Sequence, residues 1–263
     1  NEVDTFPAEN IAVIKSILDS ASILLYDIAE HPDTFVALMR TDSYNVYLIV
    51  GDKDHLDEKE EWELSERVRM GDGLISSFFE KIYKPVHDKG EHEGQDDDEK
   101  GKGKGKDDDG DDDDDQEKQT KASKNLLGVE VNGKHGDKNL NIAFTGSTAV
   151  TSGISSYQTT DETKRVRALD PAAAADGYVT PEGKDKDTEP TVVTNVLGSG
   201  RTVFYAFNFG QSATPSNSQA TENLIRAALN FVRPTKEIHI PDGRTAIGIT
   251  MKSLVVPLDL SVS

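Results

Sequence analysis

Short apolar runs that alternate with amphipathic helical stretches are the feature that most constrains the fold of this chain. The runs "YNVYLIVGD" (44–52) and "GLISSFF" (73–79) are typical of buried strands, and the charged stretch 56–73 between them has the spacing of a helix. The apolar residues of this helix that are available for burial are Leu56, Trp62, Leu64 and Val68. Because parallel strands need crossover connections, the pattern predicts an α/β fold with a mostly parallel, flavodoxin-like sheet flanked by helices.

The same pattern extends to both sides of this unit. We expect a helix over 5–21, a short strand over 22–28 and another strand over 140–146. The stretch 190–210 is typical of a β-hairpin, because two β-branched or aromatic runs surround Gly198-Ser199-Gly200, and the helix that follows ends at Pro234. Residues 147–189 are rich in Ser, Thr, Ala and Asp, and we interpret them as loops with at most one short strand.

An acidic tract interrupts the pattern. Residues 88–124 contain almost no apolar side chain, so they cannot bury enough surface to offset the entropy of ordering, and we predict a disordered insertion. Residues 91–117 hold 15 acidic residues and 4 lysines, a net charge of −11 out of −19 for the whole chain. The remainder is therefore only mildly acidic.

Composition excludes several classes of function. Nucleic acids and anionic membrane surfaces are bound through clustered Lys and Arg, which a chain of net charge −19 does not favour. No apolar run approaches the length of roughly 20 residues that a membrane helix needs. The chain has no cysteine, which excludes disulfides, thiolate metal ligands and cysteine nucleophiles.

The acidic tract matches a calcium-binding loop only in part. When Gly110 is aligned with the glycine of an EF-hand loop, Asp107, Asp109 and Asp111 fall on ligand positions, but Gly105 and Gln116 occupy the two ends where acids are required. We therefore expect no cofactor. If the tract binds a cation, the metal is calcium and the ligands are those three aspartates.

A second candidate site follows the run 44–52. Asp52, Asp54 and His55 come just after this strand, at the carboxyl edge of the predicted sheet, where open α/β sheets bind ligands. The competing interpretation is structural, with Asp52 in a turn and Asp57 capping the next helix.

Several phrases together resemble a class I glutamine amidotransferase-like domain: "YNVYLIVGD", "RMGDGLISS", "LLGVEVNG" and "GSGRTVFYAFNFG…ENLIRAALNFV". The resemblance covers residues 7–233. It implies a cysteine nucleophile at a sharp strand-to-helix turn and a histidine base. Here that turn is "LISSFFEK", with Ser76 and Ser77, and 190–233 holds no histidine. The resemblance therefore implies a non-catalytic relative, with a serine hydrolase centred on Ser76 or Ser77 as an alternative.

The ends of the chain raise a further expectation. Domains of this family begin with a strand before the first helix, whereas Asn1 lies directly ahead of that helix. An open slot beside 22–28 or 46–50 would accept a strand from a partner. We divide the chain into an α/β domain (1–234) and a β segment (235–263) that begins, or links to, a second β domain.

These observations predict a non-catalytic structural or interaction domain of an exported protein, located outside the cell or on its surface. We expect it to assemble with other protein chains or with copies of itself by strand pairing, without nucleic acid and without a membrane span in this chain. The alternative is a module that binds carbohydrate or a cation.

Overall fold

The computed structural model describes residues 7–21, 26–29, 31–50, 56–77, 126–135, 139–169, 173–179 and 189–234. The helices are α1 (Ala8–Ser20), α2 (Pro32–Arg40), α3 (Glu58–Arg69), α5 (Phe209–Ser212) and α6 (Ser218–Val232), with a 3-10 turn η1 (Pro215–Asn217). The strands are β1 (Val46–Val50), β2 (Gly73–Ser77), β3 (Val129–His135), β4 (Asn141–Ala143), β5 (Ser156–Gln158), β6 (Thr163–Ala168), β7 (Ala173–Val179), β8 (Pro190–Leu197) and β9 (Gly200–Tyr205). No helix in these ranges combines the length and the hydropathy that a bilayer span requires.

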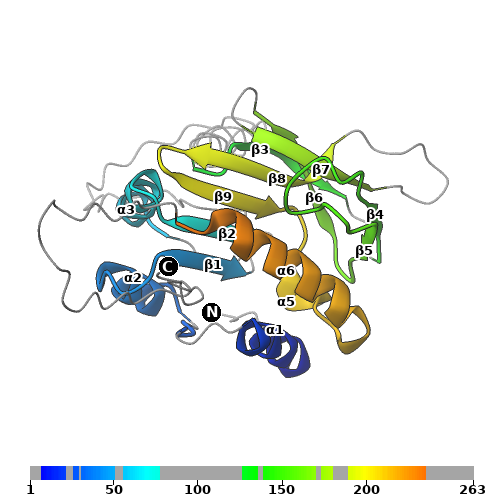
Figure 1. The fold of residues 1–263 in the computed structure, drawn as a ribbon, viewed down its shortest axis with the longest axis horizontal. Coiled ribbons are helices and arrows are strands. Elements are labelled where there is room, and N and C mark those ends of the chain that lie inside the picture. The colour runs from blue at the N-terminus through cyan, green and yellow to red at the C-terminus, as the bar shows by residue number, and fades with distance from the viewer. Residues whose placement is uncertain are drawn as a thin grey trace, which may run out of the picture.

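A mixed sheet forms the centre of the molecule (Figure 1). Its strand order is β1-β2-β9-β8-β7-β4-β5, and β3 and β6 form a separate antiparallel pair. Among the strands that the structure describes, β1, β2 and β9 run parallel to one another, and the strands from β9 to β5 are antiparallel to their neighbours. The prediction of a mostly parallel, flavodoxin-like sheet is therefore wrong.

The error arises in residues 147–189, where we expected at most one strand. The structure places β5, β6 and β7 there. These strands are short and contain Ala, Thr, Lys, Arg and Asp rather than alternating large apolar residues. Their conformation is stabilised by pairing with distant strands, which a local sequence pattern does not reveal.

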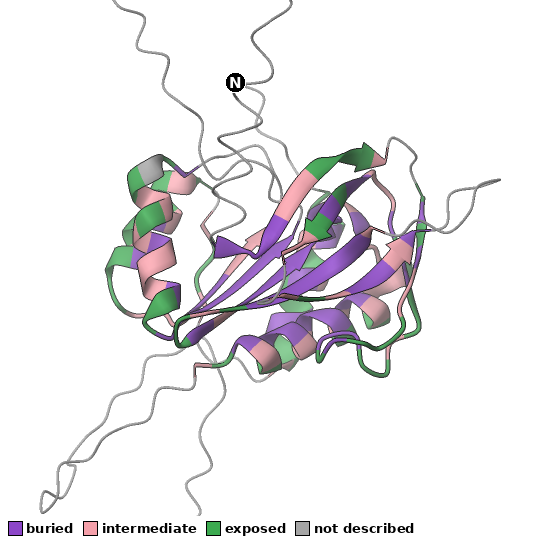
Figure 2. Cartoon of the chain, turned by 90° about the horizontal axis from the view of Figure 1, so that it is seen from above, coloured by how far each residue is buried: buried purple, intermediate pink, exposed green. Residues whose placement is uncertain are grey.

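Two layers cover the central sheet, and each buries its own set of apolar side chains (Figure 2). On one face, α1 and α6 lie side by side and pack on Ile75, Val203 and Tyr205. On the other face, α2, α3 and the β3–β6 pair pack on Leu74, Val193 and Phe204. We call these the α6 face and the α3 face.

Local signals place α3 and α6 as predicted. Asp57 caps α3 in a reciprocal capping box with Glu60, and Gly71 follows the helix with a φ of 119°. The predicted helix that ends before Pro234 is α6, and its apolar residues Leu224, Ile225, Ala228, Leu229 and Val232 are buried against the sheet. Trp62 is the exception, because its side chain on α3 is 62% exposed.

The predicted hairpin is confirmed. β8 and β9 are antiparallel, Leu197 is paired with Gly200, and the two-residue turn contains Gly198 with a φ of 62°. The predicted strand at 140–146 is confirmed as the shorter β4. Of the predicted strand at 22–28, residues 26–28 are described and have no regular structure, and residues 22–25 lie outside the described ranges.

Candidate functional site

The outer edge of β1 is the candidate site. β1 is the first strand of the central sheet and pairs with β2; within the described residues no strand pairs with its other side. The Gly73 N–H donates to the Asn45 carbonyl over 2.8 Å, which fixes the alternation of the ladder. Tyr47 and Ile49 therefore direct their backbone groups to β2. Val46, Leu48 and Val50 direct theirs away from it.

The composition of β1 suits pairing with a further strand. Its sequence, VYLIV, contains no charged residue, no proline and no glycine. Edge strands are usually protected from pairing by such residues, by bulges or by being very short. Val46 and Tyr47 are buried, whereas Leu48, Ile49 and Val50 are only half-buried. The predicted buried strand thus lies at an edge of the described sheet.

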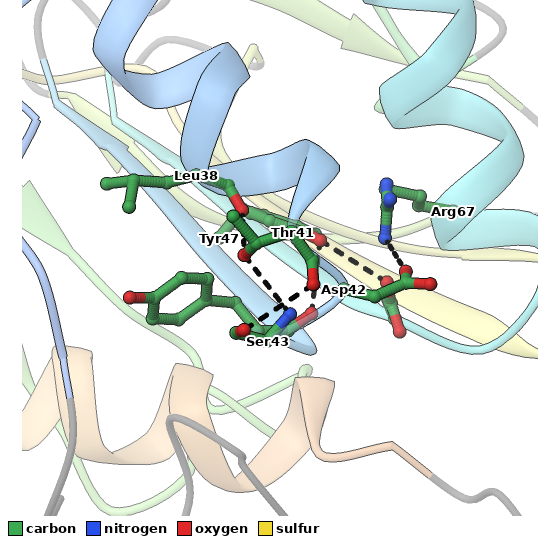
Figure 3. A network of polar contacts seen from close by, with 8 residues as sticks. Leu38, Thr41, Asp42, Ser43, Tyr47 and Arg67 are labelled. Carbon is green, nitrogen blue, oxygen red and sulfur yellow. Dashed lines mark hydrogen bonds and ion pairs between the residues drawn. The ribbon is translucent and has the colours of Figure 1, made fainter.

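Polar contacts fix the start of β1 (Figure 3). The Arg67 guanidinium on α3 donates to Asp42 over 2.6 Å, and Asp42 has a φ of 58°. The Tyr47 hydroxyl donates to the Tyr44 carbonyl over 3.1 Å and lies 3.5 Å from the Asp72 carboxylate. Burial of the Tyr47 ring, together with the negative charge of Asp72, raises the pKa of this phenol.

The turn that leads into β1 is held by its own side chains. The Thr41 hydroxyl donates to the Leu38 carbonyl over 2.7 Å and accepts from the Ser43 N–H over 3.3 Å. These bonds satisfy groups at the end of α2 and the entry to the strand. β1 is therefore presented in a defined position even though one of its sides has no described partner.

The two serines of the predicted nucleophile turn lie at the end of β2 and point to opposite faces. The Ser77 hydroxyl donates to the Phe207 carbonyl and accepts from the Phe209 N–H, each over 2.8 Å. It thus links β2 to the segment between β9 and α5. Ser76 is also fully buried, and its hydroxyl has no hydrogen bond to any described group. The hydroxyl proton of Ser77 is used in a structural bond.

Two histidines fall in the described ranges. His31 is exposed at the start of α2, and His135 lies half-buried at the end of β3. Neither one takes part in the two hydrogen bonds of the Ser77 hydroxyl, which both involve backbone groups. A hydrolytic serine needs a base within hydrogen-bonding reach. The geometry of Ser77 is that of a structural hydroxyl.

The predicted ligand residues Asp52, Asp54 and His55 lie outside the described residues. Asp57, the described neighbour of this group, caps α3: its carboxylate accepts from the Glu60 N–H over 2.8 Å. The structural interpretation of Asp57 is therefore confirmed.

The predicted calcium ligands Asp107, Asp109 and Asp111 also lie outside the described residues, as do the whole acidic tract and residues 235–263. Within the described ranges, no group of three or more His, Asp or Glu side chains is placed so that it could hold a metal ion.

Sequence reasoning missed Asp176, a fully buried carboxylate on β7. It accepts six hydrogen bonds of 2.5–3.1 Å from two hydroxyl groups and four backbone N–H groups. The donors belong to Thr145, Gly146, Ser147, Thr151 and Gly177. Burial by itself would raise the pKa of Asp176, but the hydrogen bonds outweigh it and lower the pKa to about 2. This carboxylate holds the β4–β5 loop in place.

Lys164 was missed as well. This β6 residue is fully buried, and its N–H donates to the Ala206 carbonyl over 2.7 Å. It lies two residues before Val166, so both side chains occupy the same side of β6, toward the α3 face. A lysine in "ETKRVRA" gives no local sign of burial, because charged side chains in strands usually face solvent.

Comparisons with known proteins identify folds rather than a family. Neither a family model nor a curated protein matches the sequence. Among solved structures, the cytoplasmic protein STM1381 from Salmonella typhimurium LT2 matches with a TM-score of 0.50 and 9% identity, over 87% of this chain and 89% of that one. At this identity the match indicates a common fold alone.

Two glycosidases also match, with lower TM-scores. The exo-β-1,4-mannosidase Op5Man5 from Opitutaceae bacterium strain TAV5 has a TM-score of 0.46 and 13% identity, over 88% of this chain and 32% of the mannosidase. A β-galactosidase from Bacillus circulans sp. alkalophilus has a TM-score of 0.44 and 10% identity, over 73% of this chain. This chain spans 23% of the galactosidase's length.

Proposed function

We propose that this chain is a non-catalytic interaction domain that holds an additional strand at the outer edge of β1. The observation that carries the proposal is the edge itself: five apolar residues whose alternate N–H and C=O groups point away from β2. Buried or half-buried backbone groups need partners, and strand addition supplies them in register. Export and location at the cell surface stay predictions, as does the amidotransferase resemblance.

Amide exchange on the full chain tests the proposal. If a strand occupies the edge, the outward N–H groups of Leu48 and Val50 exchange as slowly as the N–H groups of Tyr47 and Ile49, which bond to β2. Tyr47 and Ile49 serve as internal controls on the same strand. Rapid exchange at Leu48 and Val50 alone would contradict the proposal, because it would mean that the edge carries no strand.

The environment of Ser77 supports the non-catalytic part of the proposal. Substitution of Ser77 by Ala removes one hydroxyl that satisfies two buried backbone groups, so we expect a loss of about 2 kcal/mol in the free energy of unfolding. We expect no labelling of the native chain by a fluorophosphonate probe. Labelling that disappears in Ser77→Ala, in a variant that remains folded, would favour a serine hydrolase instead.

A further inference from the structure

The sequence contains a single Asn-Gly pair, Asn132-Gly133, and this pair lies in β3. The backbone nitrogen that follows an asparagine can attack the side-chain carbon Cγ of that asparagine, because the product is a five-membered ring. Glycine in the second position favours this reaction, since it has no side chain to block the approach and it restricts the backbone least. The pair is therefore the place in the chain where self-modification is chemically easiest.

The structure leaves this asparagine unprotected. The register of β3 against β6 shifts between Val131 and Gly133, so Asn132 has no partner on β6 and forms a bulge. Asn132 and Gly133 are both exposed, and within the described ranges the Asn132 side chain makes no hydrogen bond. The side-chain amide is therefore free to turn toward the backbone.

The glycine of the pair is equally open. Gly133 has a φ of 136°, a conformation that residues with a Cβ rarely adopt. A Cβ built at Gly133 would meet no atom within 4 Å. Open space thus surrounds the residue whose nitrogen is the nucleophile.

Two aspartate–glycine pairs in the described ranges could form the same ring, but the fold protects them. In Asp72-Gly73 the aspartate is buried, and a Cβ at Gly73 would lie 2.7 Å from the Cβ of Val232, so α6 closes off this glycine. In Asp176-Gly177 the carboxylate is buried and accepts six hydrogen bonds. Neither carboxyl group is free to approach the next nitrogen.

Asn217 provides a second contrast. It precedes Ser218, the smallest residue after glycine to follow an asparagine in this chain. The Asn217 side-chain amide donates to the Gln158 carbonyl over 2.7 Å and to the Ser212 carbonyl over 3.2 Å. These bonds hold the amide in place, whereas no such bond holds Asn132.

We propose that Asn132 is a site of spontaneous deamidation. The Gly133 nitrogen forms a bond to Cγ of Asn132 and loses its proton, and the side-chain nitrogen leaves with a proton as ammonia. Water then opens the succinimide ring at either carbonyl, which gives aspartate or isoaspartate. The chain loses one ammonia and gains one water, so its mass rises by about 1 Da and it gains one negative charge.

The modification changes the surface of the β3–β6 pair more than its fold. Position 132 lies between Glu130, which forms an ion pair with Arg167, and Lys134, which forms one with Glu162. The new carboxylate is added between these two pairs. Because Asn132 already lies outside the ladder, the paired residues on either side of it keep their register even when isoaspartate lengthens the backbone.

Peptide mass spectrometry on the full chain tests the proposal. Trypsin cleaves after Lys124 and Lys134 and releases residues 125–134 as one peptide. After incubation of the native chain in warm, mildly alkaline buffer, this peptide should gain about 1 Da, assigned to position 132 by fragmentation, and separate into aspartate and isoaspartate forms. In ¹⁸O-labelled water the gain should be about 3 Da, because solvent water opens the ring.

The rate in the native chain decides whether the fold leaves the site open. It should lie within about tenfold of the rate in the urea-unfolded chain, since the bulge is exposed and unpaired. Asn217 is the internal control and should react only in urea. A native rate at Asn132 that is slower than this would overturn the proposal, because β3 would then protect the pair. So would a gain in mass of this peptide that persists in Asn132→Gln, whose side chain would need a six-membered ring.

Discussion

The two edge strands of the central sheet differ in a way that bears on function. β5 has three residues, and its two polar residues Ser156 and Gln158 are exposed on either side of the buried Tyr157. The Tyr157 ring stacks on Phe207 with centroids 4.8 Å apart. β1 has five apolar residues and no such polar pair. Very short strands and polar or charged side chains protect an edge from pairing with further strands, and β1 has neither of these protections.

The two edges are also held in different ways. At the β5 edge, buried Asp176 fixes the loop that leads from β4 to β5 through six hydrogen bonds. At the β1 edge, the Asp42–Arg67 ion pair lies largely at the surface, since the Asp42 side chain is 85% exposed. The β5 edge is thus completed by the described fold. The β1 edge is held in position, but within the described ranges no strand pairs with its outer side.

The largest effect should come from removing the carboxylate at the β5 edge. Asp176→Ala leaves several buried donors without an acceptor, and we expect it to lower the free energy of unfolding by about 4 kcal/mol, measured by urea denaturation. Asp176→Asn keeps the shape and one acceptor oxygen, so its cost should be about half. A loss under 1 kcal/mol for Asp176→Ala would show that the β5 edge does not depend on this residue.

The second largest effect should come from adding a side chain at Gly73, at the amino end of the parallel strands. Gly73→Ala places a Cβ against the end of α6, and we expect a loss of about 3 kcal/mol, because backbone and side chain of Val232 must both shift. Gly153→Ala is the control: its φ of 79° adds strain, but nothing lies within 4 Å, so about 1 kcal/mol is expected. Equal losses would argue against the close approach of α6 to the start of β2.

Lowering the pH should destabilise the β5 edge, because it protonates the Asp176 carboxylate. Its pKa falls from 3.8 to about 2 in the folded state, so the ionised group stabilises the protein at pH values above about 4. This contribution of about 2 kcal/mol is lost as the pH falls from about 4 through about 2. Urea denaturation of wild type and Asp176→Asn should therefore converge in acid. A difference that is independent of pH would contradict the lowered pKa.

The smallest effect should come from the ion pair beside β1. Asp42→Asn removes the charge from an exposed carboxylate, and exposed pairs contribute about 0.5 kcal/mol. The loss should shrink further in 1 M salt, because screening weakens surface pairs. A loss above 2 kcal/mol would mean that this pair, like Asp176, is a principal support of its edge.

Sequence patterns located the elements whose signals are local. The capping of α3 by Asp57, the hairpin around Gly198 and the helix α6 were all predicted, because each depends on residues a few positions apart. Asp176 was not, since its donors lie 25 to 31 positions away, apart from Gly177. An Asp-Gly pair within the alanine run "AAAADGYV" was the one local sign that something other than a plain strand was present.

The amino-acid sequence by itself determined the helices α1, α3 and α6 and the strands β1, β2, β8 and β9, because apolar period and capping act over one or two turns of chain. It also predicted that a further strand could be added beside 22–28 or 46–50. The tertiary structure alone decided that the sheet is mixed, that β1 is the outermost of its described strands and that the end of α6 contacts Gly73. Those facts depend on contacts between residues far apart in the chain, for which no short stretch carries the information.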